Sequence, residues 1–390
     1  MAARSAVTRP ARPGGVLITG TTGFVGMEVL ARYLERTRRH LYALVRASDD
    51  AQAAARLGQA IRARFGHADA HSGRVTALAA DIERPALGLD AGRRDWLAER
   101  VSDVIHAAAS VSFSLPLDRA RAINVEGTRR LADLAELCRH RGRLERFSYV
   151  STAYVAGAHA GEFTEDDLDV GQDFRNPYER SKFEAEQVVR ARRGRLPLQI
   201  FRPSIIVGER PTGWTAAFNV LYTPLRAFAR GTLPALPGRS SSPVDVVPVD
   251  YVADGIFELS NQPVAEAAET FHLVAGAQAT TVGRLVELSA RYFDRRPPRL
   301  LAPAVYRRVL HPLLVRLGEE RRRRALRRTE VFFPYLSMRV RYDDSRARER
   351  LEPAGIRVTP VERYFSRLID FAVRAQWGRR PLDRAQVAGG

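Results

Sequence analysis

Tyr178 and Lys182 lie four residues apart in the segment Asn176-Pro-Tyr-Glu-Arg-Ser-Lys182, which has the signals of a helix start. Asn176 suits an N-cap and Pro177 the first helical position, so we expect a helix running to about residue 194. Residues four apart share one helix face, which would bring the Lys182 ammonium near the Tyr178 phenol. A nearby cation lowers the pKa of a phenol. The spacing therefore predicts Tyr178 as a general acid tuned by Lys182; the alternative is an ordinary amphipathic helix with a packed tyrosine and a solvated lysine.

A glycine-rich turn near the N-terminus predicts a dinucleotide site. The apolar run 16–19 suggests a buried strand, and the segment Gly20-Thr-Thr-Gly-Phe-Val-Gly26 joins it to a helical pattern. Glycines let the backbone approach a pyrophosphate, which the free N–H groups at a helix N-terminus favour. A second strand, 41–45, follows at the distance of a βαβ unit. We expect the cofactor to contact Gly20, Thr22, Gly23, Phe24, Val25 and Gly26.

Arg46 ends this second strand, at the place where an acid usually binds the ribose 2′-hydroxyl of NAD. A guanidinium there suits a 2′-phosphate, so the sequence favours NADPH over NADH. Two alternatives stay open at this point. Arg46 could be a solvated arginine in an arginine-rich chain, or Asp49 could be the ribose ligand.

Further motifs occur in a fixed order along the chain. Together with the glycine turn, Tyr178 and Lys182, the sequence resembles the extended short-chain dehydrogenase/reductases over about residues 14–275. Within that superfamily it resembles the fatty acyl-CoA reductases, to which the thioester reductase domains of carboxylic acid reductases and peptide synthetases are related. The segments that carry the resemblance are Asp81-Ile82, His106-Ala-Ala-Ala-Ser-Val-Ser-Phe113, Ile123-Asn-Val-Glu-Gly-Thr128, Val150-Ser-Thr-Ala-Tyr-Val155, Arg202-Pro-Ser-Ile-Ile-Val-Gly208, Pro211-Thr-Gly-Trp214 and Val244-Asp-Val-Val-Pro-Val-Asp250.

The resemblance implies roles for individual residues. Thr152 would stand at the position of the catalytic Ser or Thr and hold the substrate oxygen beside Tyr178; the alternative is a strand-end hydroxyl bonding its own backbone. Lys182 would also hold the nicotinamide ribose, and Asn124 would have a structural or proton-relay role. Asp81 and Ile82 would border the adenine. The remaining residues that the resemblance assigns to the cofactor are Ala107, Ala108, Ala109, Pro203, Ser204 and Ile206.

Composition favours an intracellular enzyme. The chain has 390 residues and a single cysteine, Cys138, so an intrachain disulfide cannot form. Cys138 lies in a helical apolar stripe, which argues against an aldehyde dehydrogenase with a reactive cysteine. Residues 1–13 lack the apolar core of a signal peptide and predict a flexible arm, and no apolar run is long enough to span a membrane. We expect a cytoplasmic protein.

The net charge of +18 predicts anionic partners. Arginines are spread over many predicted helix faces without a recognised nucleic-acid motif, so we do not expect nucleic acid. The exception is the basic, leucine-containing segment 307–328. Such a helix could meet an acidic carrier protein or lie peripherally on an anionic membrane, and the alternative is a solvated face.

The order of predicted elements indicates a doubly wound, parallel Rossmann sheet. A Pro/Gly-rich insertion at 209–243 contains Trp214, Phe218, Leu221, Tyr222, Leu225 and Phe228, which suits a substrate lid. We expect 244–249 and 271–274 to rejoin the sheet, 276–375 to form a smaller, mostly helical cap, and 376–390 to be a tail. Within the cap, 332–343 resembles the C-terminal domain of fatty acyl reductases.

These observations predict an NADPH-dependent reductase that converts a fatty acyl thioester, on coenzyme A or a carrier protein, to the aldehyde. Further reduction to the alcohol stays open. Two alternatives stay open. An extended-family dehydrogenase or epimerase, acting on a steroid-like or other hydroxy or keto substrate, would keep the same Thr, Tyr and Lys. A non-catalytic dinucleotide-sensing module would keep the glycine turn and usually lose Tyr or Lys, which are both present here.

Overall fold

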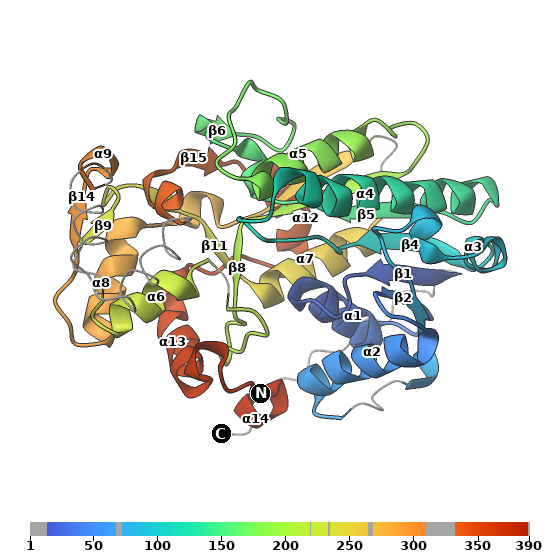
Figure 1. The fold of residues 1–390 in the computed structure, drawn as a ribbon, viewed down its shortest axis with the longest axis horizontal. Helices are drawn as coiled ribbons and strands as arrows, with labels where there is room; N and C mark the ends of the chain where they lie inside the picture. Colours follow the sequence, from blue (N-terminus) through green and yellow to red (C-terminus); the bar gives the residue numbers. More distant parts are fainter. Residues whose placement is uncertain are drawn as a thin grey trace.

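A computed structural model of the chain describes residues 14–67, 72–218, 220–232, 235–263, 268–306, 308 and 332–388 (Figure 1). The predicted arm 1–13 and the basic segment 307–328, apart from Arg308, lie outside the described residues. No described helix is both long enough and apolar enough to cross a membrane.

Seven parallel strands form the central sheet, which confirms the predicted fold class. Their order is β12-β7-β5-β4-β1-β2-β3, and it reverses direction between β1 and β4. At such a reversal the carboxyl ends of the strands open a crevice, where open α/β sheets bind their ligands. The strands are β1 (Gly15–Thr19), β2 (Leu41–Val45), β3 (Val75–Ala79), β4 (Val101–His106), β5 (Arg146–Val150), β7 (Leu198–Pro203) and β12 (Glu269–Leu273).

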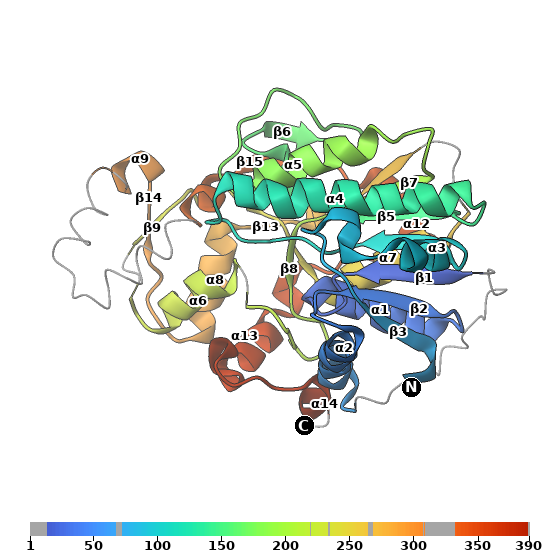
Figure 2. The same cartoon turned by 45° about the vertical axis from the view of Figure 1, so that its right-hand side comes forward.

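Helices cover both faces of the sheet, and Figures 1 and 2 show the two layers. On one face α3 (Ala91–Ala98), α4 (Leu117–His140) and α5 (Pro177–Arg190) pack on the strands through a core that includes Leu131, Ala135 and Phe147. On the other face lie α1 (Phe24–Arg36), α2 (Asp50–Phe65), α7 (Val249–Asn261) and α12 (Ser345–Leu351). Because both faces are covered, most strand residues are buried, including polar ones such as Asp103 and Arg146.

The C-terminal region is interleaved with the first domain by short strand pairs, so it is less purely helical than we expected. β15 (Arg339–Tyr342) pairs with β6 (Ala160–Phe163), β14 (Arg299–Leu301) with β9 (Ala235–Pro237), and β13 (Thr280–Thr281) with β10 (Pro243–Val244). The helices of this part include α6 (Tyr222–Ala229), α8 (Val282–Tyr292), α13 (Phe365–Arg374) and α14 (Arg384–Ala388).

Two expectations about the later strands have different outcomes. The run 271–274 rejoins the sheet as β12, as predicted. The run 244–249 does not, because its strand β11 (Val246–Pro248) pairs only with β8 (Ile205–Val207), which continues beyond the main sheet. The predicted tail is also partly ordered, since α14 packs against the end of α2.

Candidate active site

The glycine turn between β1 and α1 is tightly packed. Gly20 has a φ of +76°, and a Cβ there would lie 2.8 Å from the backbone of Ala107 and Ala108. A Cβ on Gly26 would overlap the Gly20 carbonyl group. Gly23 is the N-cap of α1 and has no side chain to cap the first N–H groups, so they are free to bind an anion. The turn therefore fits a pyrophosphate, and Thr22, Phe24 and Val25 lie within it.

A cavity of about 220 Å³ lies beside the ends of β2 and β3. Asp81 lines it, while Ile82 packs against Gly127 of α4. Asp49 also lines it, but its carboxylate accepts a hydrogen bond from the Gln52 backbone at 2.8 Å and caps α2. This capping role weakens the alternative that Asp49 is a ribose ligand.

Arg46 is 70% exposed and lies 3.9 Å from Glu83 in a loose ion pair. Arg46 does not line the cavity, whose two arginines are Arg84 and Arg93. Three aspartates share this lining, so the exposed Arg46 and the lining Arg84 are the residues that remain as candidates for the 2′-phosphate that the sequence suggests.

Tyr178 stands in the first turn of α5, whose N-cap is Asn176, as predicted. The Asn176 side chain accepts a hydrogen bond from the Glu179 backbone at 3.0 Å. Burial raises the pKa of Tyr178 to about 12, and a hydrogen bond with the Thr152 side chain lowers it in part. The expectation that the pKa of this phenol is depressed is therefore wrong for this state of the protein, since burial has the larger effect.

Lys182 is buried, and its ammonium group binds β5 directly. Nζ donates to the Tyr149 hydroxyl at 2.7 Å and to the Val150 carbonyl oxygen at 2.9 Å. Burial lowers the pKa of Lys182 to about 7, although the charge of Glu186 raises it. Because these contacts orient the cation toward the strand, Lys182 does not set the pKa of Tyr178 in the way its spacing suggested.

The ammonium of Lys182 is linked to a chain of buried polar groups that sequence reasoning missed. Lys182 donates to Tyr149, which is also hydrogen-bonded to Thr128. Thr128 Oγ1 donates to the Asn124 carbonyl oxygen, so it accepts from His106 Nε2 at 3.0 Å. His106 Nδ1 then accepts from Thr19 Oγ1 at 2.8 Å.

Burial lowers the pKa of His106 to about 3, with a further contribution from the Lys182 charge, so this imidazole is neutral at physiological pH. The chain takes one side chain each from β1, β4, α4, β5 and α5. In the sequence this hydrogen-bonded chain is signalled only by polar residues, such as Thr19 and His106, within strands that are mainly apolar.

Glu186 lies one turn beyond Lys182 and is fully buried. Its carboxylate accepts hydrogen bonds from Arg202 Nη2 at 2.7 Å and from Ser151 Oγ at 2.7 Å. Burial alone would raise the pKa of Glu186, but the charges of Arg202 and Arg190 bring it to about 2. The Glu186 carboxylate is thus a fixed negative charge one turn after Lys182, and it is bonded to Ser151, the residue before Thr152.

The Thr152 hydroxyl accepts a hydrogen bond from the Tyr154 backbone N–H at 3.2 Å. The alternative stated for Thr152, a strand-end hydroxyl that bonds the local backbone, is therefore also met in part. Thr152 Oγ1 lies 3.4 Å from the Pro203 carbonyl oxygen at the end of β7. The Ser204 hydroxyl donates a hydrogen bond to Asp245 Oδ1 at 2.5 Å, and Ile206 lies in β8. These residues surround the predicted reaction centre from the β7 side.

Asn124 joins the loop after β4 to α5. Its amide accepts from the Ser110 backbone at 2.8 Å and donates to the Ser181 hydroxyl at 2.9 Å. These bonds fit the structural role named for it. They also fix the loop that contains Ala107, Ala108 and Ala109.

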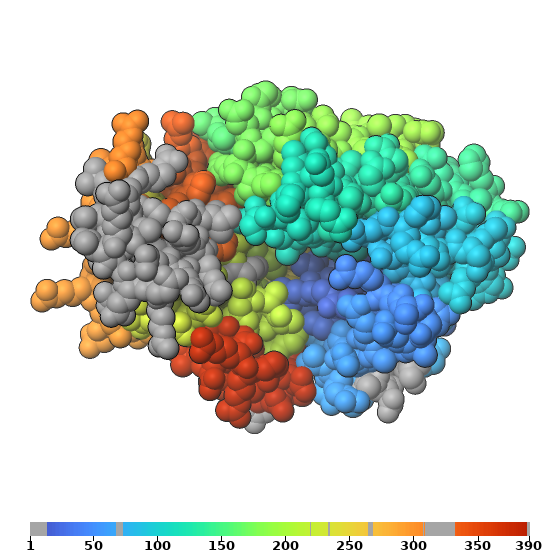
Figure 3. Space-filling model, in the orientation of Figure 1, coloured from blue at the N-terminus to red at the C-terminus, as the bar shows by residue number. Residues whose placement is uncertain are grey.

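An apolar cavity of about 80 Å³ has Tyr335 on its wall, and Tyr335 donates a hydrogen bond to Glu179, the residue after Tyr178. The cavity is bounded by β8, α6, α8 and the segment 332–336. Figure 3 shows a separate hollow in the surface, between the blue N-terminal residues and the yellow-green insertion. Three of the six predicted lid residues line the apolar cavity: Leu221, Leu225 and Phe228. The other residues along its wall are Ile205, Val220, Pro224, Leu236, Val244, Val282, Leu285, Val286, Ser289, Pro298, Phe332, Tyr335 and Leu336.

The other three aromatic residues of the insertion pack elsewhere, so the predicted lid is only partly correct. Trp214 contacts Phe24 of α1 and donates from Nε1 to the Leu382 carbonyl oxygen. Phe218 stacks on Phe371 of α13, and the Tyr222 hydroxyl accepts from the Gly208 backbone. Trp214 and Phe218 thus connect the insertion to the C-terminal region.

The fold and the site together define an extended short-chain dehydrogenase/reductase, which is a class of oxidoreductases with an NAD(P)-binding domain. The chain belongs to the male sterility protein family, which matches residues 18–256 and confirms the resemblance seen in the sequence.

Relatives of two kinds share this domain. The chain is 34% identical to the isonitrile lipopeptide synthase of Streptomyces coeruleorubidus over 282 residues, which are 71% of this chain and 18% of the synthase. It is 28% identical to the fatty acyl-CoA reductase wat of Drosophila melanogaster over 279 residues, 62% of this chain and 53% of that protein. The chain therefore spans about a fifth of the first relative and about half of the second.

A solved structure extends the likeness to nearly the whole chain. The terminal R domain from the myxalamid PKS-NRPS biosynthetic pathway is 25% identical, with a TM-score of 0.82. The alignment covers 96% of this chain and 94% of that domain, so the C-terminal region is included in the shared fold.

Proposed function

We propose that the protein reduces an acyl thioester to an aldehyde with NADPH. The observation that carries the proposal is the pair of hydrogen-bonded hydroxyls, Thr152 and Tyr178, with the buried ammonium of Lys182 on the same helix as Tyr178. Two hydroxyls at one point can hold a carbonyl oxygen and stabilise the negative charge that develops on it. The apolar cavity, which has Tyr335 on its wall, can hold the acyl chain, since its lining is almost entirely apolar.

The nicotinamide, when bound, supplies a hydride to the thioester carbonyl carbon. Thr152 and Tyr178 hydrogen-bond to the oxygen as its charge grows, and Tyr178 transfers its proton to give a hemithioacetal. A phenol with a pKa of about 12 stays protonated before the reaction and is an acid strong enough for an alkoxide. The carbon–sulfur bond of the hemithioacetal then breaks, the carbonyl re-forms, and the thiol leaves with the proton.

The residues fit the cofactor in two respects. The glycine turn leaves room at the start of α1 for a pyrophosphate, and the 220 Å³ cavity at β2 and β3 receives the adenosine. Lys182 would hold the nicotinamide ribose with the N–H that is not bound to Tyr149 or Val150. Arg46 and Arg84 would meet the 2′-phosphate, which is our reason for preferring NADPH.

For the thioester we propose a fatty acyl chain carried by a phosphopantetheine arm, on coenzyme A or on a carrier protein. The relatives named above include both a lipopeptide synthase and a fatty acyl-CoA reductase. The net charge of +18 favours either anionic carrier. Further reduction to the alcohol needs only a second hydride at the same site.

The experiment uses purified protein, NADPH and one acyl group on three carriers: coenzyme A, a carrier protein and N-acetylcysteamine. Loss of absorbance at the wavelength of the reduced cofactor is followed, and the aldehyde and alcohol are quantified. Consumption that depends on the thioester and is absent in Tyr178→Phe supports the proposal. Reduction of free ketones or sugars, but of no thioester, would contradict it and favour the dehydrogenase alternative.

A further inference from the structure

Tyr335, in the C-terminal segment after the basic region, binds the start of the helix that carries Tyr178. Its hydroxyl donates to Glu179 Oε1 at 2.6 Å and accepts from Asn176 Nδ2 at 2.6 Å. Both partners belong to the capping arrangement of α5. The segment is therefore fixed to residues two positions before and one position after Tyr178.

The ring of Tyr335 is also connected to the ring of Tyr178. It stacks on Phe113, with centroids 5.2 Å apart and an interplanar angle of 20°. Phe113 in turn stacks on Tyr178, at 5.5 Å and 29°. On another side Tyr335 contacts the edge of Tyr154, two residues beyond Thr152, at 5.0 Å. One side chain thus touches the neighbours of both hydroxyls.

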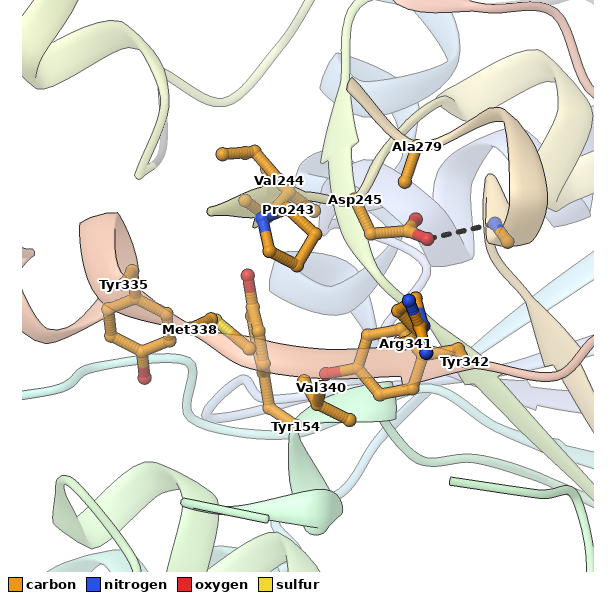
Figure 4. Close-up of a pocket in the computed structure, with 12 residues that line it drawn as sticks. Tyr154, Pro243, Val244, Asp245, Ala279, Tyr335, Met338, Val340, Arg341 and Tyr342 are labelled. Atoms are coloured by element: carbon orange, nitrogen blue, oxygen red, sulfur yellow. Dashed lines mark hydrogen bonds between the residues drawn. The ribbon is translucent and has the colours of Figure 1, made fainter. Parts of the chain in front are cut away.

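The same ring lines two pockets. It lies on the wall of the 80 Å³ apolar cavity and on that of a smaller pocket with Tyr154 and Val244. Figure 4 shows Tyr335 and Tyr154 with Pro243 and Val244 around this smaller pocket. A chain that fills the apolar cavity would therefore contact a ring that stacks, through Phe113, on Tyr178.

We propose that Tyr335 is a positioning residue for Tyr178, acting through Phe113, and that it transmits occupation of the apolar cavity to the reaction centre. This inference rests on the proposed function for its substrate. It implies that acyl chain length changes kcat as well as KM, because the chain presses on the ring that fixes Tyr178.

The test compares Tyr335→Phe, which keeps the ring and loses the hydroxyl, with Tyr335→Leu, which loses the stack. Tyr342→Phe, in the same segment, is the matched control: its hydroxyl has no hydrogen-bond partner among the described residues. We measure kcat and KM for NADPH and for a short and a long acyl thioester. We also record the ¹⁹F spectrum of 3-fluorotyrosine placed at position 178.

Tyr335→Leu should lower kcat by about ten- to a hundredfold, as small displacements of a catalytic group do, with the KM for NADPH within about twofold. The difference in kcat between the short and the long thioester should disappear, and the ¹⁹F resonance should move. Tyr335→Phe should lie between Tyr335→Leu and the wild type, and Tyr342→Phe should match the wild type.

An unchanged ¹⁹F resonance in Tyr335→Leu, or a kcat within about twofold of the wild type, would overturn the inference. If Tyr335→Leu does not fold, Phe113→Leu removes the same stack from the other side and the same outcomes apply. If the wild type reduces no thioester, the proposed function fails, while the ¹⁹F comparison still decides whether Tyr335 positions Tyr178.

Discussion

Filling the apolar cavity from its own wall should abolish selectivity for long acyl chains. Val286 lines the cavity from α8, and Val286→Phe would place a ring in the space that we assign to the chain. A buried cavity costs about 24 cal/mol for each Å³, so the ~80 Å³ space corresponds to about 2 kcal/mol when a chain fills it. At ~0.8 kcal/mol for each methylene, two or three methylenes account for this gain.

The expected result is a rise of about thirtyfold in kcat/KM across a series of straight-chain acyl thioesters, over the few methylenes that enter the cavity. In Val286→Phe the short substrates should react as in the wild type and the rise should be lost. Val170→Phe, at a valine 41% exposed that does not line the cavity, controls for the added ring. A flat series in the wild type, or an unchanged rise in folded Val286→Phe, would refute the assignment of the cavity to the acyl chain.

Three further predictions concern the cofactor side. Arg46→Ala should weaken NADPH binding by about 1.5 to 3 kcal/mol and leave NADH unchanged in a fluorescence titration, and equal losses for both would show that Arg46 does not bind the 2′-phosphate. Tyr149→Phe should lower kcat/KM by about tenfold by removing an acceptor of the Lys182 ammonium, whereas wild-type rates would mean that the bond does not orient Lys182. The pKa of Lys182, about 7, lies below its ordinary value of 10.5, so the ammonium is present below pH 7 and lost above it. A pH profile of kcat/KM should therefore fall above about pH 7, and a level profile to pH 9 would contradict this assignment.

Local signals made much of the fold and part of the site predictable from the sequence. The strand 41–45 and the N-cap at Asn176 are both found, because they depend on short-range patterning and capping chemistry. Gly20 and Gly26 are needed where the backbone turns tightly, as their positions suggested.

Tertiary contacts account for what the sequence could not show. The orientation of Lys182 depends on Tyr149 of β5, and the anchoring of Tyr335 joins residues 159 positions apart. Trp214 resembled a lid residue by composition alone, yet it packs on α1 because the two C-terminal helices create a second core there. The basic segment 307–328 lies outside the described residues, so its proposed contact with a carrier protein or an anionic membrane stays a prediction.

The central claim is that hydride is delivered to a thioester carbonyl whose oxygen Tyr178 protonates. A single turnover with NADPH deuterated at the transferred position of C4, followed by mass spectrometry of the products, tests it most directly. The account predicts one deuterium on the former thioester carbon of the aldehyde. It also predicts no labelled product from Tyr178→Phe, although that variant still binds NADPH. Unlabelled aldehyde, or labelled aldehyde formed at the wild-type rate by Tyr178→Phe, would contradict the account.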